Sequence, residues 1–225
     1  MIWLLVDILA SVSILIDCEN ENFKKMQESK PQNVIYLASR SPRRAELLEQ
    51  IGVEFIVLPS DIDETPLLNE QSDAYVLRLA AEKARACYDE LISQSAIIYP
   101  VLAADTTVSI DGKILGKPQD DDDAFQMLSI MSGRCHEVHT GIAVATDEGV
   151  QVVISTTKVE MAKLTDATIL AYIATGEPRD KAGAYGIQGL AGALIKRIEG
   201  SYSGVMGLPI FETAQLLGQA GIRIL

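Results

Sequence analysis

Residues 34–52 read VIYLASRSPRRAELLEQIG, and this stretch decides the fold class. Residues 34–39 are a short apolar run that ends in small polar residues, which is typical of a buried strand. Ser41-Pro42 then supplies a helix N-cap followed by proline at the first helical position, and Gly52 ends the helix. A strand that leads directly into a helix predicts an α/β protein.

The alternation of strands and helices continues along the rest of the chain. Further strands are expected over residues 54–58, 97–104, 106–110, 113–115, 135–146, 150–164 and 193–198. Ser72 and Thr165 are expected to cap further helices, and other helices begin at Asp120 and Pro209. Asp111-Gly112 is a strong hairpin signal, and residues 177–192 predict a structured loop. The pattern favours a single α/β domain with a mixed sheet and two lobes around a central cleft.

Composition limits the class of function. The 225 residues are 48% apolar and 22% charged, which is typical of a globular protein. Lys and Arg number 19 against 31 Asp and Glu, and the net charge of −12 argues against a nonspecific nucleic-acid binder. The three cysteines form no C-x-x-C pair, so a reducing, cytoplasmic location is expected.

Residues 1–32 differ from the rest and are interpreted as an N-terminal extension. Their first half is almost wholly apolar, but Asp7 interrupts it and no basic residue precedes Lys24, as a secretory signal would require. A membrane span would need about 20 apolar residues without a central acid. We favour an upstream or misassigned start, with the native chain beginning at Met26, over a genuine anchor; residues 33–225 then form the domain.

Three arginines crowd the expected start of the first helix. Arg40, Arg43 and Arg44 lie within five residues, next to Ser39 and Ser41. The unpaired N–H groups and the dipole of a helix N-terminus favour an anion, and guanidinium groups match phosphate oxygens. The pattern predicts a phosphate site; the alternative is an exposed cap with solvated arginines.

Isolated charges are the second feature. Asp105 follows a buried apolar run, and a carboxylate at the end of a strand needs a partner, a metal or a chemical role. The alternative is an ordinary turn aspartate. Glu64, Lys83 and Lys117, each taken alone, are typical of solvated surface charges.

The third feature is the glycine-rich segment 180–189, DKAGAYGIQG. Its glycines permit close approach of the backbone to a ligand, and the amide of Gln188 could bind the edge of a base. The alternative is an ordinary surface loop.

Other site chemistries have weaker support in the sequence. His136 and His139 are three residues apart on an expected strand, which places them on opposite faces and disfavours a zinc site. No G-x-S-x-G elbow accompanies a Ser-His-Asp arrangement, and Pro118 stands where a P-loop needs Ser or Thr.

Taken together, these segments resemble the Maf family of nucleoside triphosphate pyrophosphatases over about residues 33 to 221. The motifs that carry the resemblance are LASRSPRR at 37–44, ADT at 104–106, GKP at 116–118, DKAGAYGIQG at 180–189 and GLP at 207–209. Arg43, Thr106 and Gln188 resemble the branch that acts on dTTP and UTP. The extension, Arg40 and Thr156-Thr157 depart from the family pattern.

The resemblance implies a Maf/inosine-triphosphatase-like fold and hydrolysis of a nucleoside triphosphate to the monophosphate and pyrophosphate, with Mg²⁺ or Mn²⁺. The implied catalytic residues are Asp105, Glu64, Lys83 and Lys117, and the implied substrate-binding residues are Ser39, Ser41, Arg43, Arg44, Thr106 and Gln188. Asp105 and Glu64 are the implied metal ligands. The resemblance leaves open whether the chain forms a homodimer, and neither nucleic acid nor membrane is an expected partner.

Two alternatives to this function remain. One is a nucleotide-binding regulator of cell division or septum formation, which would not need the carboxylates. The other is the same chemistry on another base, such as that of 7-methyl-GTP.

Overall fold

The computed structural model describes residues 33–96 and 98–224, so the extension expected over 1–32, with its start at Met26, lies outside the described residues. One mixed sheet has the strand order β2-β1-β3-β5-β6-β7, with β4 paired to β3. The strands are β1 Val34–Leu37, β2 Glu54–Val57, β3 Val101–Ile110, β4 Lys113–Leu115, β5 Cys135–Thr146, β6 Gly149–Met161 and β7 Ile195–Glu199. β1 pairs parallel with β2 and β3, and the remaining pairs are antiparallel. The predicted α/β class with a mixed sheet is confirmed.

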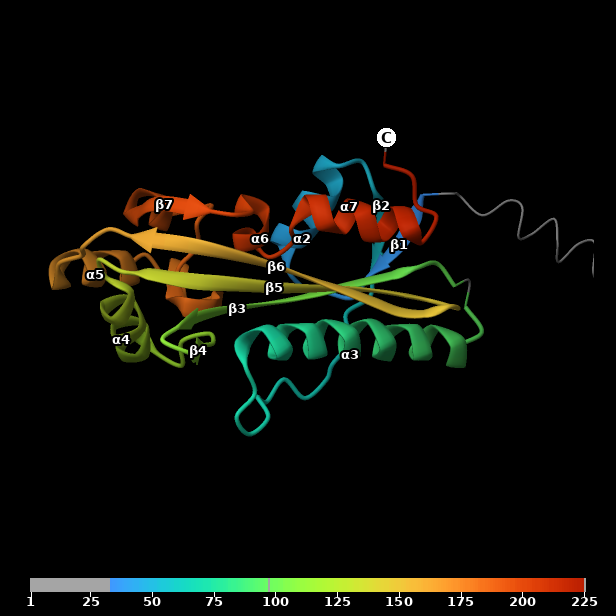
Figure 1. The fold of residues 1–225 in the computed structure, drawn as a ribbon, viewed down its shortest axis with the longest axis horizontal. Helices are drawn as coiled ribbons and strands as arrows, with labels where there is room; N and C mark the ends of the chain where they lie inside the picture. Colours follow the sequence, from blue (N-terminus) through green and yellow to red (C-terminus); the bar gives the residue numbers. More distant parts are fainter. Residues whose placement is uncertain (1–32, 97, 225) are drawn as a thin grey trace, which may run out of the picture. The chain divides into compact units, whose positions relative to one another are not determined.

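Helices cover both faces of the sheet. They are α2 Pro42–Gln50, α3 Ser72–Ser93, α4 Asp121–Met131, α5 Asp166–Ile173, α6 Tyr202–Met206 and α7 Ile210–Gln219, with 3₁₀ turns η1 Glu177–Asp180, η2 Ala182–Ala184 and η3 Leu190–Leu194. Figure 1 shows α3 along one side of the long strands and α2 and α7 on the other. Among the described helices, none is long and apolar enough to cross a membrane.

Alternate residues of β3 supply two different cores. Val101 and Ala103 pack with α3, whereas Leu102 and Ala104 pack with α2 and α7, as the two-residue period of a strand requires. Farther along β3, Val108 belongs to a third cluster with α4 and α5.

Between these apolar regions lies a band of buried polar side chains on the two central strands. Its members are Asp105 and Thr107 on β3 and His139 and Thr140 on β5. The apolar clusters around residues 101–104 of β3 and the cluster around Val108 therefore share one continuous sheet, and they meet at this polar band, where a functional site can form.

A glycine lets α3 approach the sheet closely. A Cβ built on Gly141 of β5 would lie 2.4 Å from the carbonyl oxygen of Val76 on α3. The apolar stripe of this helix, Val76, Ala80, Ala84, Cys87 and Leu91, is buried. Small residues on both sides thus bring the backbones of helix and strand together.

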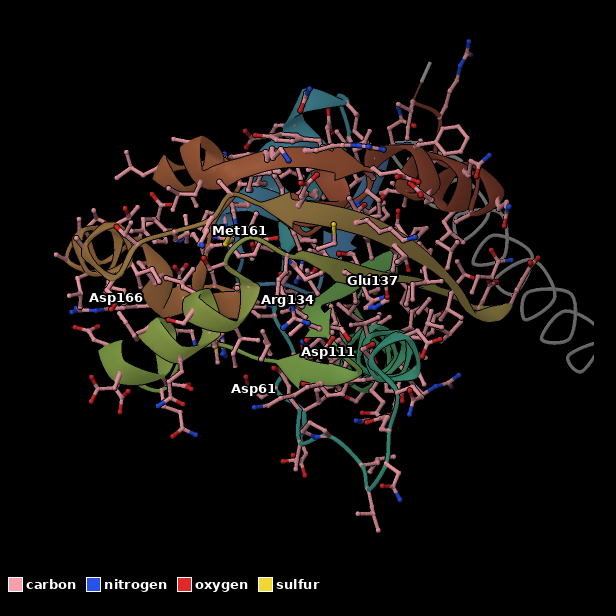
Figure 2. All side chains as sticks on the ribbon, turned by 60° about the vertical axis from the view of Figure 1, so that its left-hand side comes forward. Asp61, Asp111, Arg134, Glu137, Met161 and Asp166 are labelled. Carbon is pink, nitrogen blue, oxygen red and sulfur yellow. The ribbon has the colours of Figure 1, made fainter. Side chains whose placement is uncertain are left out.

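The hairpin predicted at Asp111-Gly112 is present. Both residues have positive φ, 53° and 73°, as a type I′ turn requires, and β3 pairs with β4 across them. Arg134 Nη2 donates to both carboxylate oxygens of Asp111 at 2.7 and 2.8 Å (Figure 2).

Several predicted boundaries were wrong. Asp105 does not end a strand, because β3 runs unbroken from Val101 to Ile110, and its pairing with β5 continues through Ser109. The expected strands 97–104 and 106–110 therefore merge into one. Gln71 occupies the N-cap of α3 and Ser72 is its first residue, while α6 was not expected at all.

Candidate active site

Arg44 joins three segments of the chain at the start of α2. Its Nε donates to the carbonyl oxygen of Gly207 at 2.8 Å, Nη1 to Ser39 Oγ at 3.0 Å and Nη2 to Thr106 Oγ1 at 3.3 Å. Burial lowers the pKa of Arg44, and the charge of Asp105 opposes that shift. The guanidinium is therefore fixed in place by hydrogen bonds instead of being solvated.

The two serines at the start of this helix make different contacts. Ser39 Oγ accepts the backbone N–H of Ser41 at 3.2 Å as well as the bond from Arg44. Ser41 occupies the predicted N-cap position, with Pro42 as the first helical residue. Arg40 turns away to form an exposed ion pair with Asp61 at 3.0 Å, so it is separate from the Arg44 cluster.

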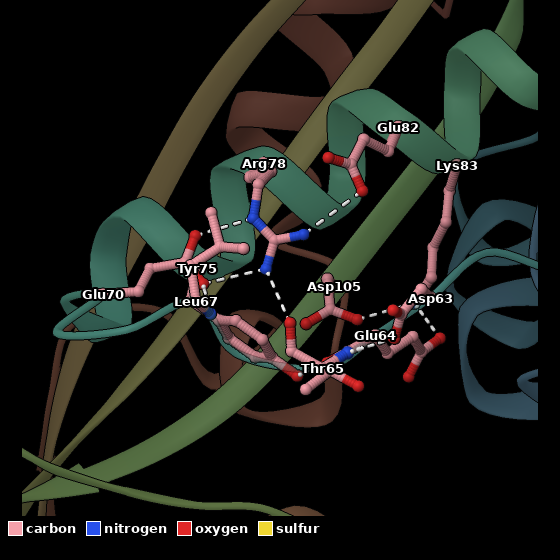
Figure 3. A network of polar contacts seen from close by, with 10 residues as sticks. All are labelled: Asp63, Glu64, Thr65, Leu67, Glu70, Tyr75, Arg78, Glu82, Lys83 and Asp105. Carbon is pink, nitrogen blue, oxygen red and sulfur yellow. Dashed lines mark hydrogen bonds and ion pairs between the residues drawn. The ribbon is translucent and has the colours of Figure 1, made fainter.

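Lys83 lies between two carboxylates. Its Nζ is 2.7 Å from Asp105 Oδ1 and 2.6 Å from Glu64 Oε1 (Figure 3). Lys83 and Asp105 are only 9% and 8% exposed, whereas the Glu64 side chain, on the loop between β2 and α3, is 53% exposed. The structure thus brings together three predicted site residues from three separate segments.

The environment of Asp105 makes it a stronger base than an ordinary aspartate. Burial raises the pKa of its carboxyl group, and the charges of Lys83 and Arg44 reduce the rise without cancelling it. Glu64, a second negative charge nearby, raises it further. A carboxylate with a raised pKa is suited to accept a proton.

Adjacent residues of β3 serve different clusters. The side chain of Asp105 contacts Lys83 on α3, whereas Thr106 Oγ1 lies 2.9 Å from Thr140 Oγ1 and accepts from Arg44. Gly207, with φ of 117°, passes close by, since a Cβ there would lie 3.5 Å from both the Arg44 and Thr106 side chains. The carboxylate cluster and the arginine cluster therefore occupy the two faces of one strand.

The glycine-rich segment contacts the same helix as Arg44. Arg43 Nη1 lies 3.4 Å from Asp180 Oδ2, and Gln188 Nε2 donates to Glu46 Oε2 at 3.1 Å. Both partners on the helix belong to α2, so one helix carries Arg44 and also contacts residues 180–189.

Lys117 is connected to the Lys83 cluster less directly than Asp105 and Glu64 are. Gly183 N–H donates to the carbonyl oxygen of Gly116 at 2.9 Å, which sets the exposed loop of Lys117 beside the glycine-rich segment. Within the described part of the chain, no ion pair joins Lys117 to Asp105 or Glu64.

Sequence reasoning missed the residue that organises the end of this segment. Glu177 accepts the Tyr172 hydroxyl at 2.8 Å and the Leu190 N–H at 2.8 Å, and Tyr172 in turn accepts the Gly186 N–H at 3.2 Å. A Cβ on Gly189 would lie 2.4 Å from Glu177 Oε2. The recurring glycines were the only sequence sign of this close packing.

Glu64 and Asp105 offer oxygen ligands of the kind that a hard divalent cation prefers. Each places an oxygen within 2.7 Å of the same Lys83 nitrogen, so the ammonium of Lys83 occupies the point on which the two carboxylates converge. No group of three or more His, Cys, Asp or Glu side chains suited to a metal occurs in the described residues. Mg²⁺ is commonly held by one or two carboxylates plus substrate phosphates, which matches two carboxylates better than a closed protein cage.

Comparison with known proteins gives consistent matches. A protein from Methylobacillus flagellatus named dTTP/UTP pyrophosphatase is 65% identical over 190 residues, covering 84% of this chain and 94% of that protein. A Haemophilus ducreyi protein named nucleoside triphosphate pyrophosphatase is 49% identical, covering 85% and 97%.

Among solved structures, the Staphylococcus aureus Ham1 protein matches with a TM-score of 0.43 and 16% identity, over 57% of this chain and 72% of that one. The family model described as Maf-like protein matches residues 34–220. This match spans most of the chain, and the two relatives named above cover 84% and 85% of it, so the chain belongs to the Maf-like protein family.

Proposed function

We propose that this chain hydrolyses nucleoside triphosphates, with dTTP and UTP as its substrates, to the nucleoside monophosphate and pyrophosphate. The observation that carries the proposal is Lys83 held between Asp105 and Glu64, with the charge of Asp105 acting also on the buried Arg44. The names of the relatives, dTTP/UTP pyrophosphatase at 65% and 49% identity, support the same substrates.

Binding of the triphosphate is assigned to the basic groups. A triphosphate carries about four negative charges, so cleavage between the α- and β-phosphates needs cations near the transferring and leaving oxygens. Arg43 and Arg44 at the start of α2 and Lys117 on its exposed loop supply them, with Ser39 and Ser41 as hydrogen-bonding neighbours.

Asp105 is assigned as the general base. It takes a proton from a water whose oxygen attacks the α-phosphorus, and the bond from that phosphorus to the bridging oxygen breaks, which releases pyrophosphate. Lys83 keeps Asp105 ionised between turnovers, because its ammonium lies 2.7 Å from Oδ1. The raised pKa of Asp105 supports this role.

Asp105 and Glu64 are also the residues that would hold a divalent cation, Mg²⁺ or Mn²⁺. When bound, such an ion neutralises phosphate charge and polarises the phosphoryl oxygens. Recognition of the base is assigned to Thr106 and Gln188. Thr106 accepts a hydrogen bond from Arg44, and Gln188 donates one to Glu46 on the same helix as Arg44.

The proposal extends to the cellular setting. The sparse cysteines and acidic charge favour a cytoplasmic enzyme whose partner is the nucleotide, with a homodimer as the assembly to test. Residues 33–225 form the catalytic domain. The family match over residues 34–220 is compatible with that division.

The test is a measurement of pyrophosphate release from dTTP and UTP by the purified protein with Mg²⁺ or Mn²⁺. Asp105→Asn should lower kcat by about 10²- to 10⁴-fold and leave nucleotide affinity largely intact, since the amide keeps the shape but cannot accept a proton. Asp147→Asn, in the exposed β5–β6 turn, is the matched control and should be as active as the wild type.

Two results would contradict the proposal. Release of orthophosphate in place of pyrophosphate would rule out cleavage between the α- and β-phosphates. Nucleotide binding without turnover in the wild type would favour the regulator of cell division, and a preference for 7-methyl-GTP would move the same chemistry to another base.

A further inference from the structure

The loop that carries Glu64 has little apolar support. It runs from the end of β2 to the start of α3, and Leu67 and Leu68 on it are 60% and 93% exposed. The position of Glu64 beside Lys83 must therefore come from polar contacts.

The first turns of α3 supply those contacts through Arg78. Its Nε and Nη2 donate to the two oxygens of Glu70 at 2.7 and 2.8 Å, a bidentate pair, and Nη2 also donates to the carbonyl oxygen of Thr65 at 3.2 Å (Figure 3). Glu70 in turn accepts the backbone N–H of Leu67 at 2.9 Å. Arg78 thus reaches the residue after Glu64 directly and a second loop residue through Glu70.

The pair is well shielded. The Glu70 side chain is 7% exposed and that of Arg78 is 21% exposed, much less than the surface ion pairs elsewhere on the chain. Hydrogen bonds from Arg78 lower the pKa of Glu70 to about 2, so the pair stays ionised at neutral pH. Bidentate pairs with limited solvent access define geometry better than exposed ones.

Tyr75 adds a contact to Glu64 itself. Its hydroxyl donates to the backbone carbonyl oxygen of Glu64 at 2.9 Å, and the guanidinium carbon of Arg78 lies 5.7 Å from the centre of its ring. The carbonyl groups of two successive residues, Glu64 and Thr65, are therefore both bound by α3.

We propose that Arg78, Glu70 and Tyr75 are positioning residues that hold the loop of Glu64 so that its carboxylate stays beside Lys83. The proposal rests on the proposed function, because it explains how Glu64 is placed for that reaction. Since Arg78, Tyr75 and Lys83 all belong to α3, one rigid helix fixes both the loop and the ammonium that Glu64 contacts.

The geometry requires arginine at this place. One guanidinium bonds both Glu70 oxygens and the Thr65 carbonyl at once, whereas the single ammonium of a lysine cannot reproduce the planar fork. Arg78→Lys therefore keeps the charge and removes the geometry. Tyr75→Phe removes one hydroxyl and is the milder variant.

The experiment measures two properties of the full chain. Amide hydrogen exchange over residues 59–71 reports on the loop, and kcat and KM for UTP report on the site. Arg78→Lys should speed exchange in the loop and lower kcat about ten- to a hundredfold with a smaller change in KM, because misplacing a group by about 1 Å costs up to about 10² in rate. Tyr75→Phe should also speed exchange in the loop and lower kcat, each by less than Arg78→Lys does.

Arg85→Lys is the matched control, an exposed arginine on the same helix, and should change neither property. Unchanged loop exchange in both Arg78→Lys and Tyr75→Phe would overturn the proposal. It would also be overturned if both variants kept the wild-type kcat while Glu64→Gln had a lowered kcat. If Glu64→Gln is fully active, the role of Glu64 in the proposed function fails, and loop exchange alone then decides whether these residues position the loop.

Discussion

Lys83 shows how a single residue makes the candidate site possible. Its ammonium lies within 2.7 Å of both Asp105 and Glu64, and Asp105 is almost fully buried. A buried carboxylate without a cation would be costly to ionise. The lysine therefore lets Asp105 carry charge at a position where solvent contributes little.

At the same scale, Gln188 is expected to decide which base is accepted. The carboxylate of Glu46 can only accept hydrogen bonds, so the Gln188 NH₂ faces it and the amide oxygen remains to accept the N3–H of uracil or thymine. Gln188→Ala should lower kcat/KM for dTTP and UTP about ten- to a hundredfold, because a bound base that loses its hydrogen-bond partner loses about 1–3 kcal/mol of binding. CTP and GTP, which did not use the amide, should change little.

The measurement is kcat/KM for dTTP, UTP, CTP and GTP in both proteins. Gln126→Ala, on an exposed position of α4, is the control and should leave all four values unchanged. Equal losses for all four nucleotides would assign Gln188 to phosphates or loop structure, and the base-reading role would be wrong.

The sequence pointed to candidate site residues but not to the residues that hold them. Asp105 belongs to the ADT motif at 104–106, whereas Lys83 lies in no motif and was expected only from the family resemblance; the structure brings the two together. Arg78 and Glu70 lie in no motif, and their contact crosses from a loop into a helix, where no periodicity reveals it. Their pairing depends on tertiary structure alone.

At the scale of elements, the close approach of α3 to β5 controls the site. Gly141 leaves no room for a side chain beneath Val76, and Lys83 projects from the same helix. Gly141→Ala should push α3 away from the sheet, destabilise the fold by about 1–3 kcal/mol and slow pyrophosphate release. Urea unfolding and kcat would measure the two effects.

Gly218→Ala on α7 is the control for that substitution, because the described residues around Gly218 leave open space for a methyl group. Its stability should equal or exceed that of the wild type, since alanine favours a helix more than glycine does. If Gly141→Ala were as stable and as active as Gly218→Ala, close helix packing would have no part in placing Lys83.

Element types were more predictable than their ends. The α2 start at Ser41-Pro42 and the Asp111-Gly112 turn depend on local residues, and both were predicted. The end of a strand at Asp105 was wrong, because a charged residue interrupts the apolar pattern while its partner Lys83, distant in sequence, allows the strand to continue.

At the scale of the whole molecule, a histidine buried in the sheet affects acid stability. His136 on β5 is 3% exposed, and its Nε2 lies 2.8 Å from the Tyr185 hydroxyl. Burial lowers the pKa of His136 from 6.5 to about 4. The unfolded chain therefore binds a proton below pH 6.5 that the folded chain does not bind until about pH 4.

Stability should accordingly fall as the pH is lowered through that window. Between pH 7 and pH 5 this residue alone should remove about 2 kcal/mol from the free energy of unfolding. His136→Gln removes the titration, so its free energy of unfolding should fall by correspondingly less over the same interval in urea titrations. Equal losses in the two proteins would show that His136 is not the group responsible.

The bond between Arg44 and Gly207 has a consequence for biosynthesis. Its two residues are 163 positions apart, so the arginine leaves the ribosome long before its carbonyl partner has been translated. Until Gly207 emerges, Arg44 lacks the hydrogen bond that joins it to the C-terminal part of the chain. A nascent chain stalled before this point therefore carries the arginine-rich motif without the complete set of Arg44 hydrogen bonds, and only a nearly complete translation product acquires that set.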